Sequence, residues 1–196
     1  DETITLNEAA EFVAQVDGVF VLEGGRPTIR KILEIPASVD FSTGNIDFHG
    51  DVTVRKGVRD LFRVRATGRV EVRGLVEAAS LESDGDMVLA GGMAGRDHGT
   101  IKCAANVVAR HLNGTRRDVK GDLQFEKEMI NCQATVKGCV LSPKGSIIGG
   151  SVEGARELEV AVLGSAAGVE TVIHLGSLPL LRARVRSLDA VVLQPG

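Results

Sequence analysis

Residues 68–99 read GRVEVRGLVEAASLESDGDMVLAGGMAGRDHG, and glycines divide this stretch into short segments with alternating apolar residues. The repeated unit is a glycine, any residue, an apolar residue, any residue and a second apolar residue. Side chains two positions apart lie on one face of a β-strand, so each unit predicts a short strand with one apolar face. Such a strand cannot bury that face alone and needs stacked copies of itself.

The same unit recurs between residues 44 and 150, at intervals that average near twenty residues without being fixed. Glycine permits the positive φ of a sharp corner, so short strands and corners are expected to coil the chain. The repeat glycines are Gly44, Gly50, Gly68, Gly74, Gly85, Gly91, Gly92, Gly95, Gly99, Gly121, Gly145, Gly149 and Gly150. The predicted inward-facing residues are Ile46, Phe48, Val52, Val54, Val70, Val72, Met87, Leu89, Ile101, Cys103, Leu123 and Phe125.

Stacked coils pair their strands in parallel, so the sequence predicts an all-β fold, a parallel β-helix or solenoid. Helices are disfavoured between residues 39 and 160, because an interior glycine costs a helix about 1 kcal/mol. A β-sandwich stays open as an alternative and favours longer strands joined by hairpins. A left-handed β-helix acyltransferase also stays open, because pairs such as Gly68 and Gly74 are six residues apart, although the intervening lengths break a strict period.

The chain is expected to have an N-terminal unit ahead of the coil. Residues 1–38 are predicted to form a β cap or flanking unit, in which VFVLE and RPTIRKIL pair as a hairpin around Gly24 and Gly25. Residues 39–176 are predicted to form the parallel β-helix. Two stretches, 55–67 and 107–120, lengthen their coils and are expected to bulge out as loops.

The C-terminal residues 177–196 change in character. Leu181, Val185 and Leu188 have helical spacing, and Ser177 suits a helix N-cap. This spacing predicts a short helix that caps the coil, or the stub of a longer helix, although three alternate arginines do not fit one polar face. An irregular tail is the alternative. The first residue is Asp, which suggests a domain cut from a longer protein.

Composition narrows the possible functions. The 196 residues include 43% hydrophobic and 25% charged residues, with a net charge of −3, so a globular protein without a phosphate-neutralising basic surface is expected. Nucleic acid is therefore not an expected partner. Trp and Tyr are absent, which disfavours a sugar cleft. No apolar run reaches 18 residues, so no integral membrane segment is expected. Three cysteines favour a reducing, cytoplasmic setting.

Candidate catalytic and metal-binding residues are few. Asp97 and His98 stand on a glycine-flanked stretch and could form an acid–base pair, although a solvated turn explains them as well. The carboxylates of Glu77, Glu82, Asp84 and Asp86 could serve a saccharide-active enzyme. The cysteines Cys103, Cys132 and Cys139 and the four histidines lack the close spacing of a zinc site. We expect no catalytic residue, no metal and no cofactor.

Residues 39–176 resemble the core of the FapA family, the bacterial flagellar assembly proteins A. The matching motifs are VDFSTGNIDFHGDVTV at 39–54, GRVEVRGLVEAASLESDGDMVLAGGMAG at 68–95, KGSIIGGSV at 144–152 and ETVIHLG at 170–176. QVDGVF at 15–20 is similar to the segment before the family's core. The resemblance implies a right-handed parallel β-helix in a bacterial cytoplasmic protein that helps to assemble or place surface or motility machinery. It supplies no catalytic residues.

The sequence therefore favours a non-enzymatic scaffold or adaptor that acts through protein partners and through contacts with itself. Its expected location is the bacterial cytoplasm, with recruitment to the membrane or cell pole as a further option. The basic stretch NGTRRDVK at 113–120 is a candidate docking loop for an acidic partner or for membrane phosphates, although a plain surface loop explains it as well. An enzyme acting on a carbohydrate or an acyl acceptor at the outer face of the β-helix is the alternative.

Overall fold

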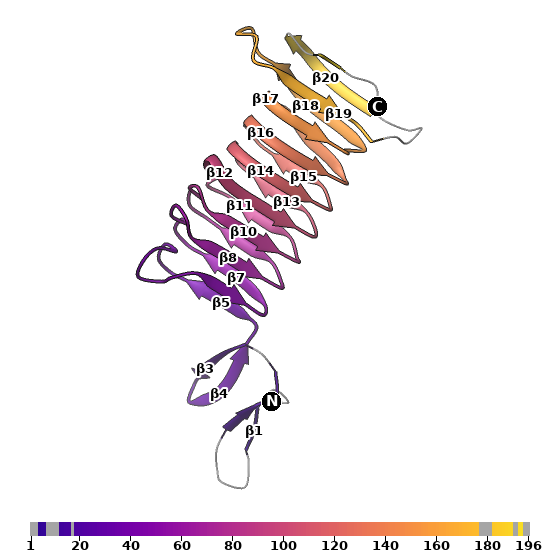
Figure 1. The fold of residues 1–196 in the computed structure, drawn as a ribbon. Coiled ribbons are helices and arrows are strands. Elements are labelled where there is room, and N and C mark those ends of the chain that lie inside the picture. The colour runs from indigo at the N-terminus through magenta and orange to yellow at the C-terminus, as the bar shows by residue number, and fades with distance from the viewer. Residues whose placement is uncertain (1–3, 7–11, 17, 177–181, 190–191, 194–196) are drawn as a thin grey trace.

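The protein is an elongated β-solenoid with two small antiparallel hairpins at its N-terminal end (Figure 1). The computed structural model describes residues 4–6, 12–16, 18–176, 182–189 and 192–193. Within these ranges the chain forms strands and turns and no α-helix. The predicted parallel β-solenoid is confirmed, because successive coils of the chain pair in parallel along one axis.

Each coil passes through three sides, which we name faces A, B and C. Face A contains β5 (Ile32–Ile35), β7 (Asp51–Val54), β9 (Val70–Val72), β11 (Met87–Leu89), β13 (Val107–Ala109), β15 (Leu123–Phe125) and the beginnings of β17 (Cys139–Glu153), β18 (Glu157–Gly164) and β20 (Arg182–Asp189). Face C contains β6 (Ile46–Phe48), β8 (Arg63–Ala66), β10 (Ser80–Ser83), the ends of β12 (Met93–Cys103), β14 (Leu112–Val119), β16 (Glu128–Val136) and β17, and also β19 (Thr171–His174) and β21 (Val192–Leu193).

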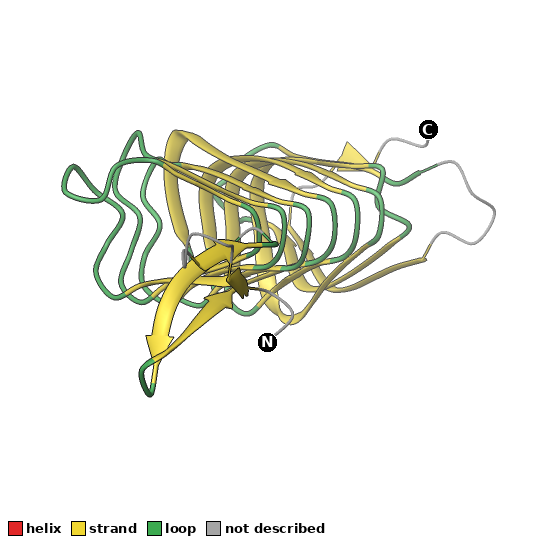
Figure 2. Ribbon diagram, turned by 90° about the horizontal axis from the view of Figure 1, so that it is seen from below, coloured by secondary structure: helices red, strands yellow, loops and turns green. Residues whose placement is uncertain are grey.

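Face B is narrower and lies between the other two. In the first coils it consists of single bridges from Val39 to Val58, from Val58 to Val76 and from Val76 to Met93. In later coils it widens into paired segments of β12, β14, β16, β17 and β18. Seen from below, successive coils repeat the same course one beside the next, and loops connect their strands at the corners (Figure 2).

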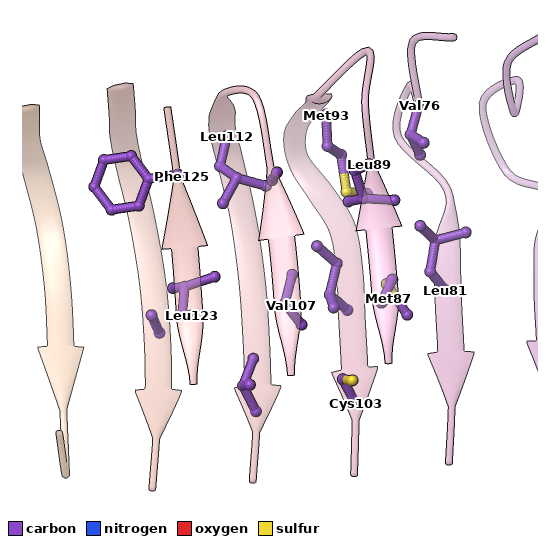
Figure 3. Packing of buried hydrophobic residues seen from close by; sticks show 14 of the residues in the cluster. Val76, Leu81, Met87, Leu89, Met93, Cys103, Val107, Leu112, Leu123 and Phe125 are labelled. Carbon is purple, nitrogen blue, oxygen red and sulfur yellow. The ribbon is translucent and has the colours of Figure 1, made fainter. Parts of the chain in front are cut away.

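The core is a set of apolar ladders that follow the solenoid axis (Figure 3). Face A supplies the ladder Val52, Val70, Met87, Val107, Leu123 and Val140, in which each residue is in register with the next. Of the twelve residues predicted to face inward, Ile46 and Phe48 in the first coil are half-buried, and the others are buried. Each coil contacts mainly its neighbours, so stability accumulates coil by coil.

Most corner glycines are needed for close approach of successive coils. The N–H of Gly85 donates to the carbonyl oxygen of Gly68 at 3.1 Å, and a Cβ on Gly85 would lie 2.8 Å from the carbonyl carbon of Gly68. Neither glycine has a positive φ. Of the repeat glycines, only Gly44, Gly50, Gly92, Gly149 and Gly150 do. The expected reason for glycine is therefore incomplete, because most of these corners exclude a side chain by contact.

A column of Asp and Asn residues follows the glycine corner before face A. Asp51 accepts the N–H of Arg69 at 2.8 Å through Oδ1, and Asn106 accepts that of Asp122 at 2.9 Å. Asp122 in turn accepts the N–H of Cys139 at 2.8 Å. Each side chain thus satisfies a backbone donor one coil further on, which explains the recurrent Gly-Asp pairs of the sequence.

The N-terminal hairpin is confirmed. Strand β3 (Val19–Glu23) pairs antiparallel with β4 (Arg26–Arg30), and both Gly24 and Gly25 have the positive φ of a tight turn. A second hairpin joins β1 (Ile4–Leu6) to β2 (Phe12–Ala14). Parallel pairing already begins at Ile32, ahead of the boundary that we predicted at residue 39. The division into cap, coil and tail stays a prediction.

Two expectations about irregular segments are wrong. The stretch 107–120 forms β13 and β14 and lies within the solenoid, because its alternate residues fill inward positions. The stretch 55–67 contains the Val58 bridge and strand β8, and leaves only a short loop at 59–62.

The expected C-terminal helix is not confirmed, because residues 182–189 form β20, paired in parallel with β18. Its apolar residues alternate with arginines, which suits the two-residue period of a strand better than a helix. Residues 177–181 and 190–191 of the expected helix lie outside the described residues.

Candidate interaction surface

The outer side of face C presents two columns of side chains, which are polar except for Val172. Column 1 contains Arg63, Ser80, Thr100, Arg116, Gln133, Ser151 and Val172. Column 2 contains Asp47, Arg65, Glu82, Lys102, Asp118, Thr135, Glu153 and His174. Both columns point outward because the residues between them, such as Leu81 and Ile101, fill the core.

A groove of about 490 Å³ lies over face C from β12 to β17. The exposed charged residues of its lining are Lys102, Arg116, Asp118 and Glu153, with hydroxyl and amide groups between them, and the buried Arg117 lies beneath. The groove contains no aromatic residue, whereas small-molecule sites are usually lined by apolar and aromatic groups. Its chemistry therefore suits a polar, charged surface of another macromolecule better than a small apolar ligand.

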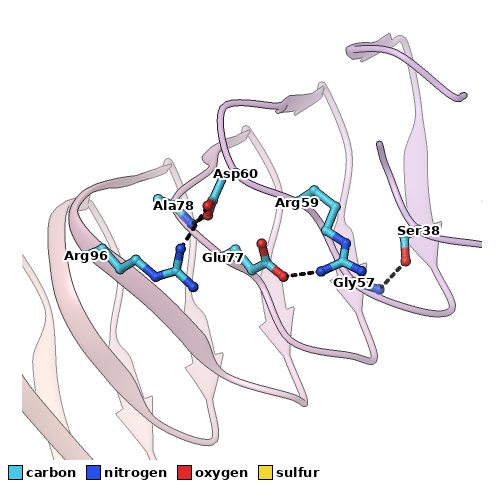
Figure 4. A network of polar contacts seen from close by, with 7 residues as sticks. All are labelled: Ser38, Gly57, Arg59, Asp60, Glu77, Ala78 and Arg96. Carbon is cyan, nitrogen blue, oxygen red and sulfur yellow. Dashed lines mark hydrogen bonds and ion pairs between the residues drawn. The ribbon is translucent and has the colours of Figure 1, made fainter. Parts of the chain in front are cut away.

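The charged groups of the groove are unpaired within the described part of the chain, since Lys102, Arg116, Asp118 and Glu153 have no ion pair there. Several charges nearer the N-terminal end are paired closely. Arg59 Nη1 lies 2.6 Å from Glu77 Oε1. Arg96 Nη1 lies 2.9 Å from Asp60 Oδ2. Figure 4 shows both of these ion pairs.

Exposed apolar side chains project from the loops between faces B and C in the first coils. Phe41 is 97% exposed and Leu61 is 88% exposed. The Phe41 ring meets the Phe62 ring edge to face, with centroids 5.2 Å apart. Leu61 also has a positive φ of 69°, which is unusual for a residue with a Cβ. Apolar groups held outward in this way are typical of surfaces that meet another protein.

The fold agrees with one comparison to known proteins. The model of the FapA family, described as the flagellar assembly protein A beta solenoid domain, matches residues 31–194. This chain belongs to the FapA family. Neither a search of curated proteins nor a search of solved structures returns a match. No helix among the residues described here has the length and apolar character to cross a membrane.

The FapA domain does not join Asp97 and His98 into an acid–base pair. Both residues are exposed on a bulge of β12, where the pairing with β14 shifts between Ala94 and Gly99. Asp97 has a positive φ of 65°, and no hydrogen bond links it to His98 within the described residues. Three of the four carboxylates are already engaged: Glu77 and Glu82 pair with Arg59 and Arg63, and Asp86 accepts the N–H of Asn106 at 3.1 Å. Asp84 lines a smaller hollow beside β10 and β12 together with Glu82.

The cysteines of the FapA domain are separate thiols. Cys103 and Cys132 are buried, and Cys139 is half-buried. Burial raises the pKa of the Cys103 thiol, and burial together with the nearby Asp122 carboxylate raises the pKa of Cys139. In the described part of the chain, no three His, Cys, Asp or Glu residues are grouped to hold a metal ion.

One charged residue of the FapA domain lies in the core. Arg117 is 4% exposed and occupies the inward position between Ile101 and Ala134 of the neighbouring coils. Its Nε and Nη2 donate to Thr115 Oγ1 at 2.9 and 2.6 Å, and its Nη1 donates to the Met129 sulfur at 2.7 Å. Burial lowers the pKa of the Arg117 guanidinium. The predicted docking loop at 113–120 is therefore a strand whose second arginine points inward.

Proposed function

We propose that this FapA-family domain is a non-enzymatic scaffold or adaptor of the bacterial cytoplasm. It takes part in the assembly or placement of flagellar or other cell-surface machinery through protein–protein contacts, including contacts with itself. The family's description supplies the link to flagellar assembly. The observation that carries the role is the groove on face C, whose four exposed charged residues have no partner among the described residues.

Three features support protein contacts over catalysis. The groove is polar and follows the solenoid axis over several coils, as a long docking surface does. The loops beside face C expose Phe41 and Leu61 to solvent. The residues considered for acid–base chemistry are exposed and unconnected, or already paired with arginines. An enzyme acting on a carbohydrate or acyl acceptor would need groups that converge on one reacting atom.

The test is complementation of motility in a flagellated host that lacks the gene. Lys102→Glu combined with Arg116→Glu removes the positive charge of the groove, so the variant is expected to restore flagellar assembly poorly. Arg110→Glu is the matched control, because Arg110 is exposed on the corner after β13, away from face C. Flagella per cell and swimming speed are measured at equal protein levels. Full restoration by the groove variant would contradict the proposal.

A further inference from the structure

Column 2 of face C alternates in charge along the solenoid axis. Asp47 is in register with Arg65, Arg65 with Glu82, Glu82 with Lys102, and Lys102 with Asp118. The sign changes at every one of these steps. Thr135, Glu153 and His174 continue the column beyond Asp118. Neighbouring coils are about 4.8 Å apart, so the column is a linear array of alternating charges.

The charged side chains of column 2 form few close ion pairs with one another. Arg65 reaches Asp47 and Glu82 only at 3.9 and 3.8 Å, and Glu82 is held instead by Arg63 of column 1 at 2.9 Å. Lys102, Asp118 and Glu153 have no ion pair with any described residue. The alternation therefore does more than stabilise neighbouring strands, since charges engaged with one another across strands lie closer.

We propose that face C binds face C of a second copy of this chain, with the two solenoid axes antiparallel. An alternating array is complementary to itself once it is reversed and shifted by an odd number of coils. The two-fold axis lies parallel to the strands, between the coils of Lys102 and Asp118. This inference rests on the proposed function, because it names one partner and one surface for the protein contacts.

The symmetry sets every contact of column 2, since the interface uses the same surface on both copies. Lys102 of each copy meets Asp118 of the other, and Arg65 meets Glu153. The remaining pairs are Glu82 with Thr135 and Asp47 with His174. No pair brings two like charges together.

The other symmetric arrangement, with parallel axes, places column 1 over column 2 of the same coil. Arg63 of one copy then meets Arg65 of the other, because both residues belong to β8 of the same coil. These two side chains carry like charges. In the antiparallel arrangement, column 1 lies over column 1, and Thr100, Ser80 and Arg63 meet Arg116, Gln133 and Ser151. Like charges in contact disfavour a partner strongly, so the antiparallel arrangement is favoured.

The interface is polar, so it forms weakly and responds to salt. Exposed ion pairs are screened over about 8 Å at physiological ionic strength. We expect self-association at low salt that weakens steeply as salt is added. Such reversibility suits a scaffold whose copies must exchange partners.

The experiment exchanges charge at Arg65 and Glu153, which lie on one column about 24 Å apart and so cannot contact each other within one chain. Arg65→Glu and Glu153→Arg are each made in the 196-residue chain, together with the double variant. Each single variant is expected to raise the dissociation constant of the dimer at least about tenfold. An equimolar mixture of the two single variants is expected to associate again, because both contacts between positions 65 and 153 then join opposite charges. The double variant is expected to associate like the parent.

Sedimentation velocity with interference optics, over about a hundredfold range of concentration, measures each species, because the chain has no Trp or Tyr for absorbance detection. Circular dichroism confirms that each variant is folded. If Arg65→Glu does not fold, Arg65→Ser replaces it and is expected to weaken the dimer and reduce its salt dependence. Arg110→Glu is the control and should leave association unchanged.

Three outcomes overturn the proposal: a monomeric parent chain at low salt, single variants that associate like the parent, or a mixture that fails to restore association. None of these results decides the scaffold role, which the motility experiment tests separately. If the groove variant impairs motility although the parent chain does not self-associate, the partner of face C is a different protein.

Discussion

Replacing Arg117 by methionine is expected to leave the solenoid as stable as before, or more stable. The guanidinium is 4% exposed, and its hydrogen-bond partners are the Thr115 hydroxyl and the Met129 sulfur, with no carboxylate. Transfer of such an ion from water costs several kcal/mol, and neutral partners recover only part of it. Methionine fills much of the same space between Ile101 and Ala134 without a charge. We expect the free energy of unfolding to be unchanged or to rise by up to about 4 kcal/mol.

Changing Thr115 to valine is expected to have the opposite effect. Its hydroxyl accepts from both Nε and Nη2 of Arg117, and valine would leave these donors of a buried cation without an acceptor. The free energy of unfolding should fall by about 3 kcal/mol. In the double variant the donors and the missing acceptor disappear together, so most of this loss should be recovered. The two substitutions are therefore expected to be strongly non-additive.

The assay is urea unfolding followed by far-ultraviolet circular dichroism for the parent, both single variants and the double variant. The expected order of stability places Arg117→Met at or above the parent and Thr115→Val below it. The finding that Arg117→Met is less stable than Thr115→Val would refute the reasoning, since the guanidinium would then be a net source of stability. Additive effects of the two substitutions would also refute it.

Three further predictions concern the corners and loops. Gly85→Ala should lower the free energy of unfolding by about 2 kcal/mol in urea, because its Cβ would lie 2.8 Å from the backbone of the coil before it. Asp122→Ala should cost about 1 kcal/mol by the same assay, whereas Asp122→Asn keeps an acceptor for the N–H one coil on and should cost less. Hydrogen bonds from the Ser42 side chain and backbone hold the pKa of Asp40 below 3.8, so its contribution to stability is present above that value and is lost as the pH falls through the lower folded pKa. An NMR titration should show this lowered pKa, and Ser42→Ala should move it back toward 3.8; an unmoved value would contradict the assignment.

The solenoid could be predicted from the sequence because its signals are local. A strand of one coil, such as Val70–Val72, shows its apolar face within three residues, and the glycine before it marks the corner. The hairpin around Gly24 and Gly25 was predictable for the same reason. The closeness of neighbouring coils was not apparent, because it depends on the stacking of one corner glycine upon the next.

Two features were missed because they conflict with the usual pattern. Arg117 breaks the rule that inward positions are apolar. For this reason the composition of residues 113–120 indicates a basic loop, whereas the structure has a strand there. Counting back from Val119 in steps of two would have placed Arg117 and Thr115 on the inward side. Leu181, Val185 and Leu188 have helical spacing, but an open sheet edge on β18 offers a pairing partner that favours a strand there.

The groove on face C could not be predicted, because its charges come together through register. Lys102 and Asp118 are sixteen residues apart, and Thr135 and Glu153 follow in later coils of different length. The length of each coil decides which side chains align, and only the strand pairing reveals it. Identity and spacing in the sequence were therefore insufficient to predict the surface.

The most direct test of the account is site-specific photo-crosslinking in living cells that are assembling flagella. A photoreactive amino acid replaces Lys102 in the groove, and the same amino acid replaces Arg110 as a control away from face C. The account predicts protein adducts from position 102, including a dimer of this chain, and few from position 110. Absence of protein adducts at position 102, with the protein present and folded, would contradict the claim that FapA-family function in this chain depends on contacts through face C.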